Sequence, residues 1–163
     1  MIVVADTSPL NYFLRLGRVN LLHVIYGRVL VPTAVLEELR HPSAPPEVRL
    51  WASQPPEWLE TVEASQLDPT FLPKLGAGER EAISLALLMQ ADILLIDEFL
   101  GRQEAEALHI AVAGTLAVLL RASLLGHLDF PSVLQDLRQL GFRVSRTVEN
   151  DLLALYEQTK RRL

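Results

Sequence analysis

The sequence predicts an α/β protein whose parallel sheet is covered by helices on both faces. Short apolar runs alternate with longer stretches of helical periodicity, which is typical of repeated β-α-β units. The chain has 163 residues, and half of them are hydrophobic. That is enough material for one compact domain with a substantial core, so we expect a single domain.

The expected strands are five short runs rich in branched apolar residues. Continuous apolar runs of this kind are typical of strands that are buried on both faces of a parallel sheet. In chain order these runs are Ile2–Ala5, Val29–Val31, Leu59–Val62, Ile93–Ile96 and Ile110–Val112.

Helices are expected between and after these strands. Glycine 17 separates the first two, and a proline at position 32 suits the start of the third, because its missing N–H costs nothing there. Five prolines in residues 41–58 leave room for only a short fourth helix. The expected helices are Pro9–Leu16, Val19–Ile25, Thr33–Arg40, Glu47–Ala52, a glycine-led helix in residues 75–90, Glu98–Leu108, Leu116–Leu125, Ser132–Leu140 and Val148–Lys160.

The composition excludes several kinds of site. There is no cysteine, so disulfides and thiolate zinc sites are excluded, and a metal would need oxygen or imidazole ligands. The apolar stretches are too short or too interrupted by charge to span a bilayer, so a cytoplasmic location is expected. The net charge of −5 lacks the basic footprint of proteins that hold nucleic acid by electrostatics alone. This charge does not exclude a local basic rim around an acidic site, although the terminal "KRRL" also suits a helix end, where positive charges interact favourably with the helix dipole.

Two acids follow expected strands directly. Asp6 comes after the first strand, and Asp97 comes after "ILLI". Functional groups in open parallel sheets collect beyond the carboxyl ends of the strands, which makes both acids candidates for a site. Each also has an ordinary alternative, since aspartate commonly ends a strand by accepting hydrogen bonds from nearby backbone N–H groups.

Two further acids lie on helices. In "PTAVLEEL" the apolar stripe is bordered by Glu38, whereas Glu37 points away from it. In "GEREAISLALLMQ" Glu79 is in line with the buried side, and Glu81 projects to the opposite face. A first-turn acid such as Glu79 is also explained by the helix dipole alone.

Convergence of the four acids at one rim is the informative feature. Two carboxylates about 4 Å apart repel by roughly 4 kcal/mol at an effective dielectric constant near 20, so an ionised group of them needs protons or a cation. Oxygen ligands without cysteine or a well-placed histidine suit Mg²⁺ or Mn²⁺. Such a site can support metal-assisted phosphodiester hydrolysis.

The sequence resembles the PIN-domain proteins, the superfamily of the VapC-type toxin ribonucleases, and within it a PIN-like branch common in bacteria and archaea. The resemblance covers most of the chain up to Gly126. It is carried by "VVADTSPLNYFLRLGRVNLL", "GRVLVPTAVLEEL", "LGAGEREAISLALLMQADILLIDE" and "GRQEAEALHIAVAGTLAVLLRASLLG".

The resemblance implies a three-layer α/β/α sandwich and RNA cleavage that depends on Mg²⁺ or Mn²⁺. Asp6, Glu38, Glu79 and Asp97 fall on the family's catalytic, metal-binding acids. The chain departs from the family at Glu79, where an aspartate is usual. The extra methylene of glutamate could shift the metal or weaken its binding.

Four more positions match outer members of the family's site. Thr7 and Ser8 would orient an acid, with helix capping as the plain alternative. Glu98 and Arg102 follow the last acid, as this branch tends to show.

The resemblance also implies a domain organisation and partners. Residues 1–126 would form the PIN-like core, and residues 127–163 a helical extension packed on the same domain. A small antitoxin protein and a second copy in a homodimer are the expected partners, besides an RNA substrate. The competing hypothesis is a PIN-like domain that binds RNA or a protein without cutting. A receiver-like domain and an aspartate-nucleophile phosphatase are disfavoured, because no second acid follows Asp6 in the expected place.

Overall fold

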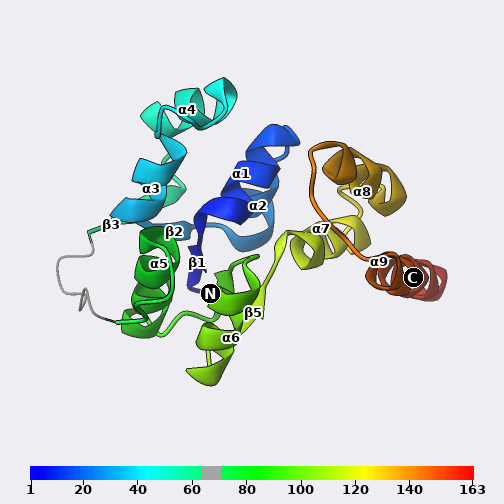
Figure 1. Cartoon of the computed structure of the whole chain (residues 1–163). Coiled ribbons are helices and arrows are strands. Elements are labelled where there is room, and N and C mark those ends of the chain that lie inside the picture. Colours follow the sequence, from blue (N-terminus) through cyan, green and yellow to red (C-terminus); the bar gives the residue numbers. More distant parts are fainter. Residues whose placement is uncertain (64–70) are drawn as a thin grey trace. The chain divides into compact units, whose positions relative to one another are not determined.

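The sheet of the computed structural model, which describes residues 1–63 and 71–163, has five parallel strands. Their spatial order is β3-β2-β1-β4-β5, so the first strand of the chain lies in the centre (Figure 1). All of the pairings are parallel. The strands are β1 (Val3–Ala5), β2 (Val29–Pro32), β3 (Leu59–Val62), β4 (Ile93–Leu95) and β5 (Val112–Ala113).

Nine helices alternate with or follow these strands in the described residues. The first begins at Thr7, two residues before the expected start at Pro9, because the chain turns into the helix directly after Asp6. The helices are α1 (Thr7–Arg15), α2 (Asn20–Tyr26), α3 (Thr33–Leu39), α4 (Pro46–Ser53), α5 (Ala77–Leu88), α6 (Phe99–Ala107), α7 (Thr115–Leu124), α8 (Phe130–Gln139) and α9 (Arg146–Arg162).

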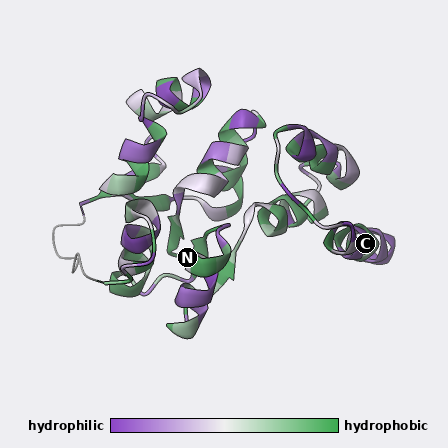
Figure 2. Ribbon diagram, viewed as in Figure 1, coloured by the Kyte–Doolittle hydropathy of each residue, from purple (hydrophilic) through white to green (hydrophobic). Residues whose placement is uncertain are grey.

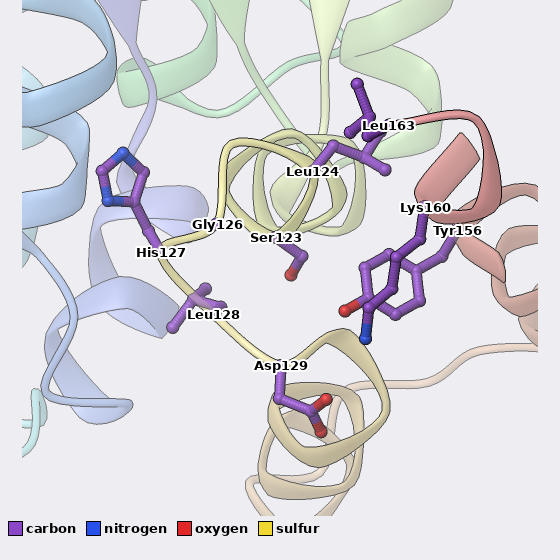
Figure 3. Close-up of a pocket in the computed structure, with 9 residues that line it drawn as sticks. All are labelled: Ser123, Leu124, Gly126, His127, Leu128, Asp129, Tyr156, Lys160 and Leu163. Carbon is purple, nitrogen blue, oxygen red and sulfur yellow. The ribbon is translucent and has the colours of Figure 1, made fainter.

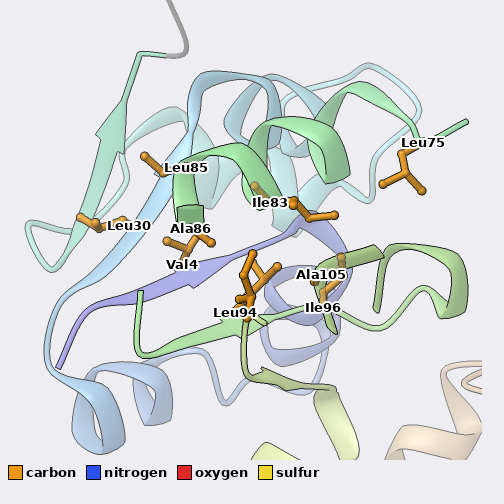
Figure 4. Packing of buried hydrophobic residues seen from close by; sticks show 11 residues of the cluster. Val4, Leu30, Leu75, Ile83, Leu85, Ala86, Leu94, Ile96 and Ala105 are labelled. Carbon is orange, nitrogen blue, oxygen red and sulfur yellow. The ribbon is translucent and has the colours of Figure 1, made fainter. Parts of the chain in front are cut away.

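The hydrophobic core explains why both faces of the sheet are covered. Val4 and Leu94 point to one face, where they belong to the same buried cluster as Ile83 and Ala86 of α5 (Figure 4). Successive side chains of a strand point to opposite faces. Val3, Ala5 and Leu95, which point to the opposite face, are also fully buried, so helices cover the other face as well. This confirms the three-layer α/β/α sandwich.

The order of the strands creates a switch point in the middle of the sheet. From β1 the chain moves outward to β2 and β3, then returns to the other side of β1 for β4 and β5. Ala5 pairs with Leu95 at the carboxyl ends of the two neighbouring strands. Open α/β sheets bind ligands outside the carboxyl ends of the strands at such a point.

The chain divides into two compact units, a core unit (Met1–Thr115) and a C-terminal unit (Leu116–Leu163). α7 from Leu116 onward belongs to the C-terminal unit, and the expected domain boundary at residue 126 stays a prediction. In this unit the ring of the fully buried Phe130 packs against Tyr156, with 5.6 Å between the ring centroids. The expected packing of residues 127–163 on the core stays a prediction.

The distribution of hydrophobic and hydrophilic residues agrees with this arrangement of helices and strands. Figure 2 shows hydrophobic colour along the strands of the sheet, and hydrophobic and hydrophilic residues alternating around the helices. Among the described residues no helix is both long enough and apolar enough to cross a membrane.

Candidate active site

Asp6 lies at the end of the central strand. Its backbone N–H donates to the carbonyl oxygen of Leu95 at 2.9 Å, which continues the pairing of β1 with β4 by one residue. The side chain is only 3% exposed, and its Oδ1 atom is buried without a hydrogen-bond partner. Asp6 precedes α1, yet its side chain makes no capping hydrogen bond to that helix. The turn-forming explanation of this carboxylate therefore does not account for Oδ1.

The other three acids act on Asp6 electrostatically. The pKa of Asp6 is raised to about 7, chiefly by burial and to a smaller extent by the negative charges of Glu79, Glu38 and Asp97, against the opposing effect of a hydrogen bond from the Thr7 backbone. Charges have such an effect only at short range. Glu38, Glu79 and Asp97 are thus near enough to Asp6 to act on its charge, and their role as one metal site stays a prediction.

Asp97 is held by the start of α7. Thr115 donates its backbone N–H to Oδ1 at 2.6 Å and its hydroxyl to Oδ2 at 2.7 Å. Burial raises the pKa of Asp97, while the two Thr115 hydrogen bonds and the charge of Arg102 lower it. A Cβ added at Gly114 would lie 2.9 Å from Oδ1, so only glycine allows this close approach.

Glu38 lies at the end of α3 and is held by two neighbouring helices. Its Oε1 atom accepts a hydrogen bond from the Gly78 N–H at 3.0 Å, and its Oε2 atom accepts one from the hydroxyl of Thr7. A Cβ added at Gly78 would lie 2.5 to 2.8 Å from three atoms of the carboxylate. Glycine at this position is therefore what lets α5 approach Glu38.

Glu79 has a structural task besides its place in the acid group. Its Oε2 atom accepts a hydrogen bond from the Gly76 N–H at 3.0 Å, which caps the start of α5. Glu81, which we expected to project away from the buried side, instead accepts a hydrogen bond from the Ala34 N–H at 2.9 Å and ties α5 to the first turn of α3.

The outer residues expected from the resemblance are placed as follows. Thr7 and Ser8 occupy the first turn of α1 and do not precede it, so they are not its N-cap; Thr7 orients Glu38, as predicted for an outer residue. Glu98 is the exposed residue before α6, and Arg102 is exposed one turn into that helix.

The donor set suits a hard cation, because all of its potential ligands are carboxylate oxygens and one of them, Oδ1 of Asp6, is buried without a partner. The residues that the structure describes contain no group of three or more His, Asp or Glu side chains close enough to enclose a metal ion. Glu38, Glu79 and Asp97 are each engaged by hydrogen bonds from the protein. A cation would have to draw carboxylates closer together than they lie here.

Three residues of the site were not predicted from the sequence. Gly78, Gly114 and Thr115 fix the positions of Glu38 and Asp97 through contacts with parts of the chain that are far away in sequence. The only local signal was the glycine pair in "LGAGER", which gives no indication of its partner.

A separate cavity of about 510 Å³ lies in the C-terminal unit (Figure 3). Its acid, Asp129, is occupied in capping α8 through the Ser132 N–H at 3.1 Å. Lys160 reaches over the ring of Tyr156 in the same cavity. The cavity gathers no pair of carboxylates and is distinct from the acid group.

Comparisons with known proteins agree with this fold. The chain is similar in structure to a PilT N-terminus domain protein, SSO1118, from the hyperthermophilic archaeon Sulfolobus solfataricus P2, with a TM-score of 0.54 and 16% sequence identity over 75% of this chain and 93% of that one. No curated protein matches the chain. The model of the DUF3368 family, described as a PIN domain, matches residues 2–158. The chain therefore belongs to this family of PIN domains.

Proposed function

We propose that the protein is a ribonuclease that uses Mg²⁺ or Mn²⁺ bound by Asp6, Glu38, Glu79 and Asp97. The PIN domain is a nuclease-type fold, which supports the reaction class. The observation that carries the proposal is Oδ1 of Asp6, a buried oxygen without a partner at the switch point of the sheet, whose carboxyl group is influenced by three further acids. Burying a carboxylate without a partner lowers the stability of the folded protein. A bound cation would offset this cost.

The residues divide the work between binding and orientation. A bound divalent cation would offset the negative charges of the four acids and polarise a phosphate oxygen and a water molecule. Thr115 holds both oxygens of Asp97, and Thr7 with Gly78 holds Glu38, so the acids keep their orientation when RNA enters. Arg102, which is exposed and whose charge acts on Asp97, would contact a phosphate group of the substrate.

An RNA cleavage assay tests the proposal. Purified protein is incubated with labelled single-stranded RNAs and Mn²⁺ or EDTA, next to the Asp6→Asn and Asp97→Asn variants. Glu37→Gln is the matched control, because Glu37 is exposed on the same helix as Glu38. We expect Mn²⁺-dependent cleavage by the wild type and by Glu37→Gln, and a loss of at least about 100-fold in both aspartate variants, since oxyanion and charge contacts at reacting centres have effects of this size. Cleavage that persists in both variants would refute the assignment.

Thermal unfolding in increasing Mn²⁺ tests the metal site independently of activity. A cation that binds only the folded state raises Tm with concentration. We expect such a rise for the wild type and none for Asp6→Asn. An unchanged Tm in the wild type would rule out the metal site.

The cellular role that we propose is that of the toxin in a toxin-antitoxin pair, acting on cellular RNA and neutralised by a small partner protein. Induced expression in a bacterial host tests it. Arrest of growth by the wild type but not by Asp6→Asn would support the role, whereas equal growth of both strains would contradict it.

A second candidate, a PIN domain that binds RNA or a protein without cutting, is favoured by one observation. Glu79 replaces the usual aspartate and is already engaged in capping α5. Binding of single-stranded RNA by the wild type without cleavage in Mn²⁺ or Mg²⁺ would establish this candidate in place of the nuclease.

A further inference from the structure

An exposed aromatic ring stands beside the acid group. Phe99 is 72% exposed, although it is the first residue of α6 and follows Asp97 by only two positions. The helix packs on the core through Gly101 and Ala105, and the neighbouring Leu100 is partly buried against the core cluster. Among the described residues, the Phe99 ring therefore takes no part in the packing of α6 on the core cluster.

Helical geometry places Phe99 on the same side of α6 as Arg102. Residues three apart are neighbours on a helix surface, so Phe99 and Arg102 share one side. The Arg102 guanidinium lies 3.7 Å from the Cβ position of Gly114, and its charge acts on Asp97. The side of α6 that carries Arg102 toward Asp97 thus also carries the exposed ring.

The charge of the protein indicates what the ring can bind. With a net charge of −5 and four acids at the site, the protein gains little from contacts with phosphate groups. Aromatic rings bind single-stranded nucleic acid in another way, by stacking on bases, and this contact does not depend on charge or sequence.

We propose that Phe99 is a stacking subsite for an unpaired nucleobase of single-stranded RNA, next to the acid group. This inference rests on the proposed function for its choice of RNA, and what it adds is the role of Phe99; the bases of a duplex are already stacked, so the subsite would take an unpaired base. Arg102 contacts the phosphate side of the same nucleotide, and Phe99 contacts its base.

Binding measured without metal tests the subsite apart from cleavage. The probe is a fluorescein-labelled 12-nucleotide RNA of mixed sequence in EDTA, either single-stranded or paired with its complement. We expect Phe99→Ala to weaken binding of the single strand by about 5- to 30-fold, in the lower part of the range for one base-aromatic stack, and to leave duplex binding unchanged. Phe99→Trp restores the affinity, whereas Phe99→Leu, which is apolar but lacks a π face, does not.

Leu88→Ala is the matched control. Leu88 is another exposed apolar side chain, and it lies at the far end of α5, about 13 Å along the helix from Glu79. Its substitution is expected to leave RNA binding unchanged. Since Phe99 is exposed, all three of its variants should fold with the wild-type Tm, which is measured in parallel.

The outcomes separate the subsite from the nuclease. Undiminished single-strand binding by Phe99→Ala, an equal loss on the duplex, or no RNA binding by the wild type would overturn the subsite. A change of oligomeric state in Phe99→Ala, measured by light scattering, would also overturn it, because the ring would then be buried between copies. RNA binding that depends on Phe99, without cleavage by the wild type, would uphold the subsite and refute the nuclease. Cleavage that Phe99→Ala leaves unchanged would uphold the nuclease and refute the subsite.

Discussion

At the scale of single residues, Asp6 is an acid of the site whose burial in the ionised form costs folding free energy. Its carboxyl group has an ordinary pKa of 3.8 and a pKa of about 7 in the folded protein, chiefly because it is buried. The folded state therefore keeps a proton that the unfolded chain loses between these two values. The contribution of Asp6 to the unfolding free energy is therefore most favourable in acid and falls as the pH rises from about 4 to about 7, by at most about 1.4 kcal/mol per pH unit.

We predict that Asp6→Asn removes this dependence. Urea unfolding in EDTA at pH 5.5 and 7.5 should show a smaller loss of unfolding free energy for the variant than for the wild type, and the variant should be the more stable of the two at pH 7.5. A residual slope is expected, because burial raises the pKa of Asp97 as well. Identical slopes in the two proteins would show that Asp6 is ionised throughout.

Thr115 gives a second prediction for a single residue. It is fully buried, and its hydroxyl donates to Oδ2 of Asp97. Thr115→Val keeps the shape and the backbone hydrogen bond but removes this donor, so we expect a loss of about 1.5 to 3 kcal/mol of stability at pH 7.5, the usual size for a hydrogen bond to a charged group. Thr115→Ser retains the hydroxyl and should lose less; equal losses would assign the effect to packing alone.

The sequence singles out four candidate acids, whose role stays a prediction, but not the groups that form hydrogen bonds with them. Asp6 and Asp97 stand out because they directly follow apolar strands, and helical spacing selects Glu38 and Glu79. The same spacing misplaced Glu81, whose partner Ala34 lies 47 residues earlier. Hydrogen bonds to Gly78 and Thr115 depend on how α5 and α7 arrive at the site, which no local pattern encodes.

At the scale of elements, local sequence patterns were sufficient to predict which helices and strands exist, but not at which residues they begin and end. The five strands and nine helices found in residues 1–63 and 71–163 were all predicted, since apolar runs and helical periodicity are local properties. The last strand was expected at Ile110–Val112 but is Val112–Ala113, because its pairing with Leu94 and Leu95 decides which residues are in the sheet. Likewise α1 begins at Thr7 before the proline that suggested its start.

The junction of α3 and α5 depends on a glycine, which gives a prediction for this pair of elements. Gly78→Ala would put a Cβ within 2.5 to 2.8 Å of the Glu38 carboxylate and force that side chain away. We expect at least a 10-fold loss of Mn²⁺-dependent cleavage and a smaller rise of Tm with Mn²⁺.

Gly76→Ala is the matched control for this junction. A Cβ there would lie 3.5 Å from Oε2 of Glu79, an ordinary contact, and its backbone is extended, so alanine fits. This variant should retain activity and metal response. Equal activity of the two variants would mean that Glu38 has no part in the site.

At the scale of the whole molecule, the order of the strands creates the site. The apolar patterns predict five parallel strands but not which strand neighbours which, since any order buries the same residues. The observed order places β1 between β2 and β4, and so brings Asp6 and Asp97 to adjacent strand ends although 91 positions separate them in the sequence.

The charge of the whole molecule leads to the last prediction, on how RNA binding depends on salt. Each phosphate contact adds about −0.7 to the slope of log K against log [salt] for a single strand. With a net charge of −5, Arg28 paired to Glu60 and Arg138 paired to Glu149, we expect only one or two such contacts, hence a slope shallower than about −1.5 in EDTA. Arg102→Gln should flatten the slope by about 0.7. A wild-type slope of about −3 or steeper would instead reveal a basic RNA-binding surface, and stacking would no longer be needed to explain the affinity.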